Sequence, residues 1–283
     1  MRLGFHLPIA GGLLKAVGAA RTLGLDCLQI FAGNPRSWSQ RPLDQDLAGQ
    51  FRRQARLAGL RPISVHAPYL VNLASPDQEL WQGSVALLAD QLRRAQALGA
   101  QAVVVHPGSR GQRDLAWGLE RVALGVALAL EQAGPGAACW LENTAGGGGQ
   151  VGGTLSQLAW LIERLPGLDV GVCLDTAHAH AAGYHLAQTT EVGRFVDRVQ
   201  GLLGLERVGL WHFNDTLHAR GSRRDQHTHL GKGRLGRPAF AALLADSRLA
   251  EAAAVMETPK DSRWADRRNL AFLRRLERQI CNG

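Results

Sequence analysis

The chain has few cysteines, and they are not paired. Cys27, Cys139, Cys173 and Cys281 stand far apart among 283 residues, and no CxxC motif occurs. Three of them lie in apolar runs typical of strands, which favours buried free thiols over disulfides and a reducing compartment. An iron–sulfur cluster or a cysteine-based structural zinc site is therefore not expected.

Long apolar segments are also missing. His6, several glycines and Lys15 interrupt the N-terminal stretch, so it lacks the apolar core of a signal peptide. No segment approaches the ~20 uninterrupted apolar residues of a membrane helix. We therefore predict a cytoplasmic protein that is not inserted in a membrane.

The sequence contains no complete glycine-rich nucleotide-binding motif. It also contains no segment typical of a linker between domains. No GxGxxG follows the first predicted strand, and the glycine-rich run NTAGGGGQVGGT at residues 143–154 lacks the GK[ST] of a P-loop. We interpret that run as a loop lining a groove. Because no Ser/Pro-rich segment or break in composition divides the chain, we predict one domain over residues 1–283.

Negative charge is in deficit. The formal net charge is +8, while 46% hydrophobic and 20% charged residues are typical of a folded protein with an ample core. A basic balance favours polyanionic partners such as nucleic acid, although on its own this indication is weak.

Short β-rich runs alternate with helical patterns from end to end. The predicted strands are residues 3–8, 27–33, 62–68, 102–108, 139–144, 170–176, 208–215 and 253–258. Between them lie amphipathic stretches such as 79–99 and 114–134, each ending in glycine as helices often do, and a helix over 263–280 closes the chain. Eight strands alternating with eight helices favour an α/β fold of the (β/α)8 TIM-barrel type over an open doubly wound sheet.

Each of the last six predicted strands has a metal-binding side chain near its end. These residues are His66, His106, Glu142, Asp175, His212 and Glu257. A single histidine at a strand end is usually a structural residue. In a barrel, however, the ends form a ring, so six such side chains converge on one pocket.

More ligands follow in the loops. His178 comes three residues after Asp175, and Asp225 and His227 are two apart. Imidazoles and carboxylates without thiolates suit zinc, manganese or iron at a hydrolytic site, and nine ligands suit two or three ions. His6 ends the first strand and faces the same pocket. The histidines at positions 180, 185, 218 and 229 have no required place.

At this point the chain resembles the endonuclease IV family of apurinic/apyrimidinic endonucleases. The matching blocks, in order, are HAPYLVNLASP, VVHPGS, LENTAGGG, GVCLDTAHAHAAGY, HFNDT, GSRRDQHTHLGKGRLG and METP. Together they span essentially the whole chain, and as a set they are highly specific.

The resemblance implies a TIM barrel with three zinc ions, with Mn²⁺ possible at one or more sites. The implied ligands are His66, His106 and Glu142 for the first ion, Glu142, Asp175, His212 and Glu257 for the second, and His178, Asp225 and His227 for the third. The implied reaction is hydrolysis of the phosphodiester 5′ to an abasic site in duplex DNA. It leaves a 3′-hydroxyl and a 5′-deoxyribose phosphate, and blocked 3′ ends are also trimmed. For the mechanism, we expect a metal-bridging hydroxide near Glu142 to be the nucleophile.

The same resemblance points to DNA contacts. Arg36 in NPRSW and Tyr69 in HAPYL match residues that enter the minor groove and flip out the abasic nucleotide. Without the resemblance they would be a solvated cation and a packing aromatic. The resemblance also implies damaged duplex DNA as the partner, a monomer, and association with the nucleoid through DNA. The arginines at positions 220, 223 and 224 suit DNA phosphates.

Two positions depart from the family pattern. Lys232 stands where the family often has glutamate, and Leu217 stands where lysine is common. Neither position is a ligand, so the departures concern details of DNA contact.

Two rival functions remain open from the residues. A sugar isomerase on a related metal-binding barrel needs one or two ions, so the trio of His178, Asp225 and His227 counts against it. A non-catalytic protein that recognises DNA damage would need no such ligand set.

Overall fold

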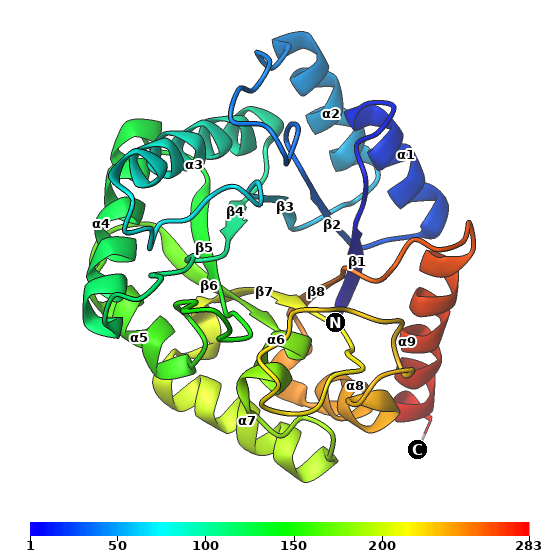
Figure 1. Cartoon of the computed structure of the whole chain (residues 1–283). Helices are drawn as coiled ribbons and strands as arrows, with labels where there is room; N and C mark the ends of the chain where they lie inside the picture. The colour runs from blue at the N-terminus through cyan, green and yellow to red at the C-terminus, as the bar shows by residue number, and fades with distance from the viewer. Residues whose placement is uncertain (283) are drawn as a thin grey trace.

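A computed structural model describes residues 1–282 as a closed parallel barrel (Figure 1). Within those residues, eight strands pair in chain order, and β1 closes the ring against β8. The strands are β1 (Arg2–His6), β2 (Cys27–Ile30), β3 (Ile63–His66), β4 (Ala102–Val105), β5 (Ala138–Glu142), β6 (Val170–Asp175), β7 (Val208–His212) and β8 (Ala253–Met256). The predicted TIM barrel is therefore confirmed.

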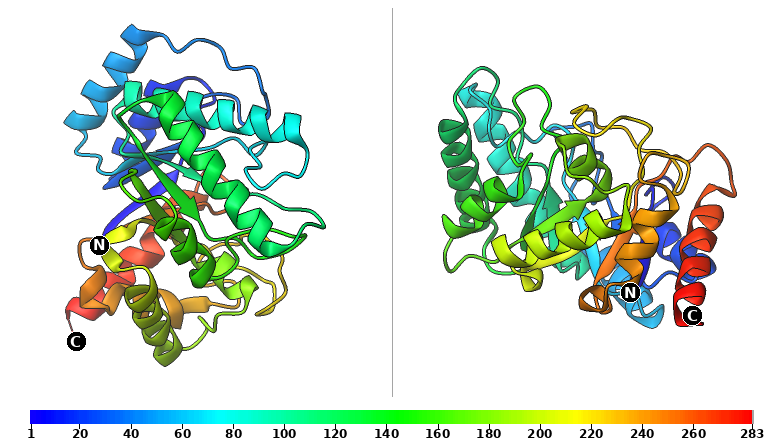
Figure 2. Two further views of the ribbon diagram at one scale, coloured as in Figure 1. Left: turned by 90° about the vertical axis from the view of Figure 1, so that its left-hand side faces the viewer. Right: turned by 90° about the horizontal axis from the view of Figure 1, so that it is seen from below.

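Helices form an outer ring around the barrel. In the described part of the chain they are α1 (Leu13–Leu23), α2 (Gln45–Leu57), α3 (Gln78–Leu98), α4 (Leu115–Ala133), α5 (Leu155–Glu163), α6 (Thr176–Ala182), α7 (Thr189–Leu202), α8 (Gly236–Ala245) and α9 (Ala265–Cys281). The side views in Figure 2 show them packed around the strands. The sequence predicted eight helices, and the additional one is α6.

Helix α6 exists because Asp175 caps its first turn. The Asp175 carboxylate accepts the backbone N–H of His178 at 2.8 Å, so the chain turns into a helix directly after β6. This short helix lies in the connection that the sequence pattern assigned to a loop. It holds His178 one turn from the strand end.

The long helices end as predicted, within a residue or two. Asp77 and Asp114 cap the N-termini of α3 and α4, and Gly99, with φ 69°, ends α3 in the left-handed conformation. Because Gly99 leaves the helix in this conformation, the chain turns back at once toward β4.

The strands are one to three residues shorter at their C-terminal ends than predicted. β3 ends at His66, for example, since Pro68 has no N–H to continue the ladder. The last residues of the predicted strands thus belong to the βα loops that surround the pocket.

The predicted buried thiols are confirmed. Cys27, Cys139 and Cys173 are buried and unpaired, and burial raises the pKa of each to about 12, so they remain protonated at neutral pH. Cys281 is exposed near the end of α9. Over residues 1–282 we find no helix long and apolar enough to cross a bilayer.

Candidate metal centre

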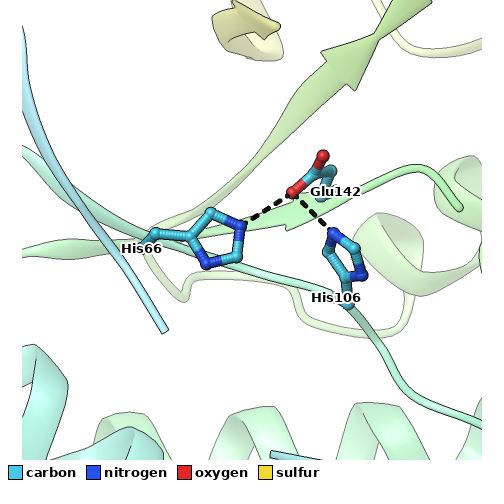
Figure 3. Close-up of side chains that lie close together, drawn as sticks. All are labelled: His66, His106 and Glu142. Carbon is cyan, nitrogen blue, oxygen red and sulfur yellow. Dashed lines mark hydrogen bonds and ion pairs between the residues drawn. The ribbon is translucent and has the colours of Figure 1, made fainter. Parts of the chain in front are cut away.

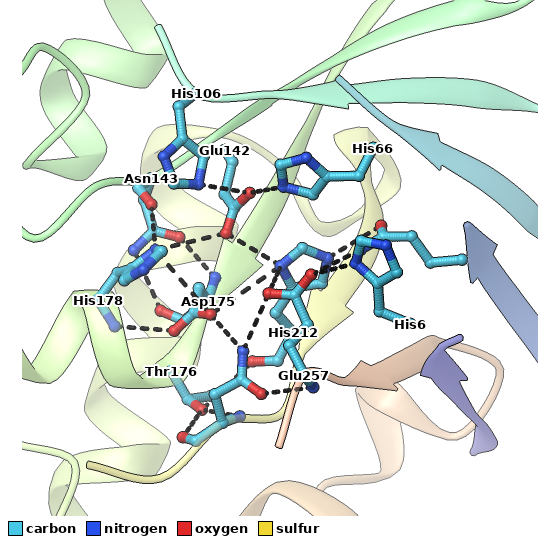
Figure 4. A network of polar contacts seen from close by, with 12 residues as sticks. His6, His66, His106, Glu142, Asn143, Asp175, Thr176, His178, His212 and Glu257 are labelled. Carbon is cyan, nitrogen blue, oxygen red and sulfur yellow. Dashed lines mark hydrogen bonds and ion pairs between the residues drawn. The ribbon is translucent and has the colours of Figure 1, made fainter. Parts of the chain in front are cut away.

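The six predicted strand-end ligands converge at the C-terminal mouth of the barrel, as Figure 4 shows. Four of them are the last residues of β3, β5, β6 and β7, and the other two directly follow β4 and β8. They are His66, His106, Glu142, Asp175, His212 and Glu257. Glu142, Asp175 and His212 are almost fully buried, which is costly unless each has a charged or hydrogen-bonded partner.

Glu142 lies at the centre of this group. His66 Nε2 and His106 Nε2 lie 3.3 and 3.0 Å from its Oε2 (Figure 3). On the other side, His212 Nδ1 is 2.9 Å and His178 Nδ1 is 3.4 Å from its Oε1. One buried carboxylate thus contacts four imidazoles, and its two oxygens face two different groups of ligands.

Backbone carbonyls set the tautomers of three histidines. Nδ1 of His66 lies 2.8 Å from its neighbouring carbonyl, Nδ1 of His178 lies 2.9 Å from the carbonyl of Asn143, and Nδ1 of His227 lies 3.4 Å from the carbonyl of Glu257. Since a carbonyl only accepts, each Nδ1 carries the proton and each Nε2 presents a lone pair to the centre.

His212 has the opposite arrangement, and Gln29 causes it. The Gln29 amide donates to Glu257 Oε1 at 2.8 Å, so its oxygen faces His212 Nε2 at 3.1 Å. His212 Nε2 therefore donates, and Nδ1 keeps its lone pair toward the carboxylates. We did not predict Gln29, and the only signal for it was a polar residue inside an apolar strand.

The arrangement fits metal ions. Nε2 of His178 and of His227 are buried, and neither forms a hydrogen bond of acceptable geometry among the described residues, although both face the same carboxylate oxygen. Asp225 Oδ1 lies 3.0 Å from the first and 3.6 Å from the second. Buried lone pairs beside carboxylates, with no thiolate, form a donor set suited to zinc or manganese.

Ligand atoms gather into three groups, each within 4.8 Å. They are His66, His106 and Glu142; Glu142, Asp175, His212 and Glu257; and Asp175, His178 and His227. The first two match the groups that the resemblance implied. In the third, Asp175 stands beside the two histidines, since its Oδ2 is 3.5 Å from His227 Nε2, while Asp225 contacts both from the loop.

The histidines and carboxylates of the centre shift one another's pKa values, and the shifts favour the charged form of both kinds of side chain. Burial alone would raise the pKa of Glu142, but His212 and His106 hold that pKa well below its usual range. Burial alone would lower the pKa of His178, but Asp175 and Asp225 raise it well above its usual range. Asp225 itself has a pKa of about 2, because its contacts with His178 outweigh burial. Glu142 and Asp225 are therefore ionised at neutral pH.

His6 also faces this pocket, as its position at the end of β1 suggested. Its Nδ1 lies 2.9 Å from Glu257 Oε1, and burial lowers its pKa. His6 thus contacts one oxygen of Glu257, whose other oxygen lies 3.4 Å from His212 Nδ1.

A pocket of about 550 Å³ opens over the group. Its lining includes Phe31, Tyr69, Asp225 and Lys260 in addition to the histidines. Tyr69 is 69% exposed and packs edge-on against Phe31, with ring centroids 5.4 Å apart. Arg36 is exposed in the neighbouring loop after β2. Both residues predicted to contact DNA therefore lie on the face that carries the metal centre.

The comparisons with known proteins find relatives that match over nearly the whole chain. A family model described as a xylose isomerase-like TIM barrel matches residues 17–276. Endonuclease 4 of Thermus thermophilus is 44% identical over 277 residues, 96% of this chain and 97% of that one. The probable endonuclease 4 of Natranaerobius thermophilus is 37% identical and covers 98% of both chains. A crystal structure of endonuclease IV from Thermus thermophilus superposes with a TM-score of 0.89 at 42% identity, over 99% of this chain and 100% of that one.

The chain belongs to the endonuclease IV family. The resemblance seen in the sequence motifs is thereby confirmed. The chain spans essentially the full length of these relatives, so the endonuclease IV likeness extends over the whole barrel.

The remaining histidines of this endonuclease IV chain lie around the centre. His180 is buried on α6, and its pKa falls to about 4 because of burial and the nearby charges of His185 and Arg220. His218 pairs with Gln226, and His229 with Asp261.

The family departures Leu217 and Lys232 are both exposed, as are the arginines at 220, 223 and 224.

Asp215 fixes the loop that carries Asp225 and His227, and we did not predict this role. Its buried carboxylate accepts five backbone N–H groups at 2.9–3.2 Å, and its carbonyl accepts the N–H of Thr228 at 2.8 Å. The five donors are Thr216, Gly231, Gly233, Leu235 and Gly236. A Cβ on Gly233 would lie 2.2 Å from the carboxylate, which explains the glycine in GKGRLG.

Replacing Asp215 with asparagine should loosen this loop. An amide nitrogen cannot accept, so several buried N–H groups lose their partner, and we expect the free energy of unfolding to fall by at least about 2 kcal/mol. Urea unfolding measures the loss, and amide hydrogen exchange should accelerate in residues 216–230. Asp169→Asn, at an exposed position, is the matched control. Equal stability of the two variants would refute the role of Asp215.

Proposed function

We propose that this chain cuts duplex DNA on the 5′ side of abasic sites, leaving a 3′-hydroxyl and a 5′-deoxyribose phosphate, and trims blocked 3′ ends. As a member of the endonuclease IV family it is a nuclease, a hydrolase with a role in DNA repair. The observation that carries the proposal is the sharing of ligands between groups: Glu142 and Asp175 each belong to two of the three. Such sharing suits three adjacent ions, which we take to be zinc with Mn²⁺ as a possible substitute.

Bound ions would stabilise phosphate oxygens as Lewis acids and bring the pKa of a water toward ~7. The protein's own part is to place and orient the ligands. Backbone carbonyls hold His66, His178 and His227, and Gln29 holds His212, in the tautomer whose lone pair faces inward. Because Glu142 belongs to two ligand groups, we assign it to hold the ions and orient the attacking water rather than to remove a proton.

The pocket walls suit a sugar phosphate without a base. Phe31 and Tyr69 form one wall, and Lys260 lies on the lining with its Nζ 2.5 Å from Asp266. A nucleotide with a base would need to be unstacked and accommodated here, whereas an abasic sugar is small and costs least to extrude. Arg36 and Tyr69 at the rim are proposed to fill the space that it leaves in the duplex.

Removing the Tyr69 ring should weaken recognition more than chemistry. We expect Tyr69→Ala to lower affinity for an abasic duplex by about tenfold, since a ring stacked on bases contributes about 1–3 kcal/mol. Single-turnover nicking at saturating enzyme should change much less. Binding and nicking assays on one labelled duplex separate the two effects. Leu124→Ala, another exposed apolar side chain, on α4, is the control. Unchanged affinity of Tyr69→Ala would contradict the assignment.

We further propose that the partner is damaged duplex DNA, that the chain acts as a monomer, and that it is cytoplasmic and associated with the nucleoid through DNA. The excess of positive charge and the exposed arginines at 220, 223 and 224 support a DNA partner.

The product ends test the proposal. Incubation with a duplex that contains one abasic analogue should give a fragment that a polymerase extends directly, which requires a 3′-hydroxyl. A fragment blocked at its 3′ end would refute the proposed position of cleavage. Turnover of a free ketose without nicking would instead favour a sugar isomerase, although the third ligand group counts against one.

A further inference from the structure

A second hollow lies at the end of the barrel remote from the metal centre. It has a volume of about 620 Å³ and lies between α2, α3 and the starts of β3 and β4. These helices are neighbours in the outer ring (Figure 1), and the turn after α2 lies at the same end of the barrel as the chain termini (Figure 2, right). The strands run from this end toward the metal centre, so the two sites face in opposite directions.

Four guanidinium groups line this hollow, and no carboxylate does. Arg52, Arg53 and Arg56 come from α2 and Arg61 from the turn that follows. Across residues 1–282, none of the four forms an ion pair within 4.0 Å. Arg52 donates to the carbonyl of Ala97 at the end of α3, while the described structure gives the guanidinium groups of the other three no acceptor.

Clustered like charges repel, so an anion would stabilise this face. The guanidinium group matches a phosphate with two parallel hydrogen bonds, which makes phosphate the ligand of choice. The exposed part of the lining is arginine, glycine and Gln101, whereas Leu60, Ile63 and Leu98 are buried beneath it. The exposed lining of the hollow therefore offers mostly charge, which favours a phosphate backbone over a protein partner.

We propose that this arginine-lined hollow binds the phosphate backbone of a second DNA segment. One duplex cannot reach both faces, because bending a 20–30 bp site by even 40–90° costs several kcal/mol, and contact with opposite ends of the barrel requires a larger bend. A chain bound to damage by its metal-containing face therefore carries a second, sequence-independent site that faces away from the first duplex. That site allows transfer between neighbouring DNA segments. The simultaneous binding of two DNA segments rests on the proposed function, whereas the anion site itself does not.

The test is capture of a second duplex by the metal-loaded protein. A 15-bp duplex with an abasic site and a non-hydrolysable 5′ linkage is immobilised, and one protein molecule is bound to each duplex. A labelled undamaged duplex is then added at low salt. We expect wild type to retain it. Arg53→Gln/Arg56→Gln should weaken retention at least tenfold, with the slope of log affinity against log salt smaller by about two.

The matched control is Arg275→Gln/Arg278→Gln, which removes two exposed arginines with the same spacing from α9. It should retain the second duplex, and both double variants should nick a short abasic duplex like wild type, which confirms folding. Equal loss in the two double variants, or no capture by wild type, would overturn the inference. Stronger competition by polyglutamate than by duplex would point to an acidic protein and overturn it as well. Failure to load the first duplex would count against the proposed function instead.

Discussion

Glu142→Gln should reduce nicking at an abasic site by at least about 10³-fold, the scale of losing a group that organises charge in a transition state. The carboxylate contacts four histidines and belongs to two ligand groups. Glutamine keeps the shape but replaces one oxygen with a nitrogen that has no lone pair, so one ligand group loses a donor.

Binding of the same duplex should largely persist in Glu142→Gln, because the proposed DNA contacts at Arg36 and Tyr69 lie at the rim. Glu163→Gln, at an exposed position on α5, controls for loss of a carboxylate. Comparable nicking by the two variants would show that Glu142 has no role in catalysis. Loss of binding together with nicking would place Glu142 in recognition instead.

Removal of metal should abolish nicking and change how stability depends on pH. In the metal-free protein the pKa of His178 is raised well above 6.5 despite burial, chiefly by Asp175 and Asp225. A raised histidine pKa contributes stability that is fully present below 6.5 and is lost as pH rises through the folded value. Glu142 and Glu257 have lowered pKa values despite burial, because of His212 in both cases. Their contribution is present above their unfolded values near 4.5 and is lost on further acidification.

The metal-free protein should therefore be most stable between about pH 4.5 and 6.5. Metal ions require unprotonated imidazoles, so the stability that they add should grow from about pH 6 to about pH 8.5. Thermal unfolding with and without a chelator at these two pH values measures this difference. The gap between the two melting temperatures should be wider at the higher pH, and nicking should return when zinc is restored. A gap that is the same at both values would contradict the assignment of these histidines as ligands.

The barrel and the ring of candidate ligands could be predicted because both follow from local patterns. Polar residues at the ends of the last six apolar runs mark the mouth of a barrel, and closure of the sheet brings those ends together whatever the details of the loops. The assignment of the ligands to three groups came from the resemblance to the endonuclease IV family. The spacing of the ligands along the sequence left that assignment open.

Other features depend on contacts between distant residues. Gln29 is a single polar residue inside a strand, and only the closed barrel places it against His212, 183 positions away. In the sequence Asp215 resembles an ordinary loop residue. Only the fold shows that five backbone N–H groups, from residue 216 and from residues 231–236, converge on its carboxylate. Asp175 was predicted for one group, and the short helix α6 that it caps brings His178 beside it, so that it borders two groups.

The central claim is that a three-ion centre in this chain cuts DNA at abasic sites. Zinc titrated into metal-free protein, with bound zinc and nicking of an abasic duplex measured on the same samples, tests it most directly. We predict that full activity appears only as bound zinc approaches three ions per chain. Protein that is fully loaded yet does not nick, or that reaches full activity with a single ion, would contradict it.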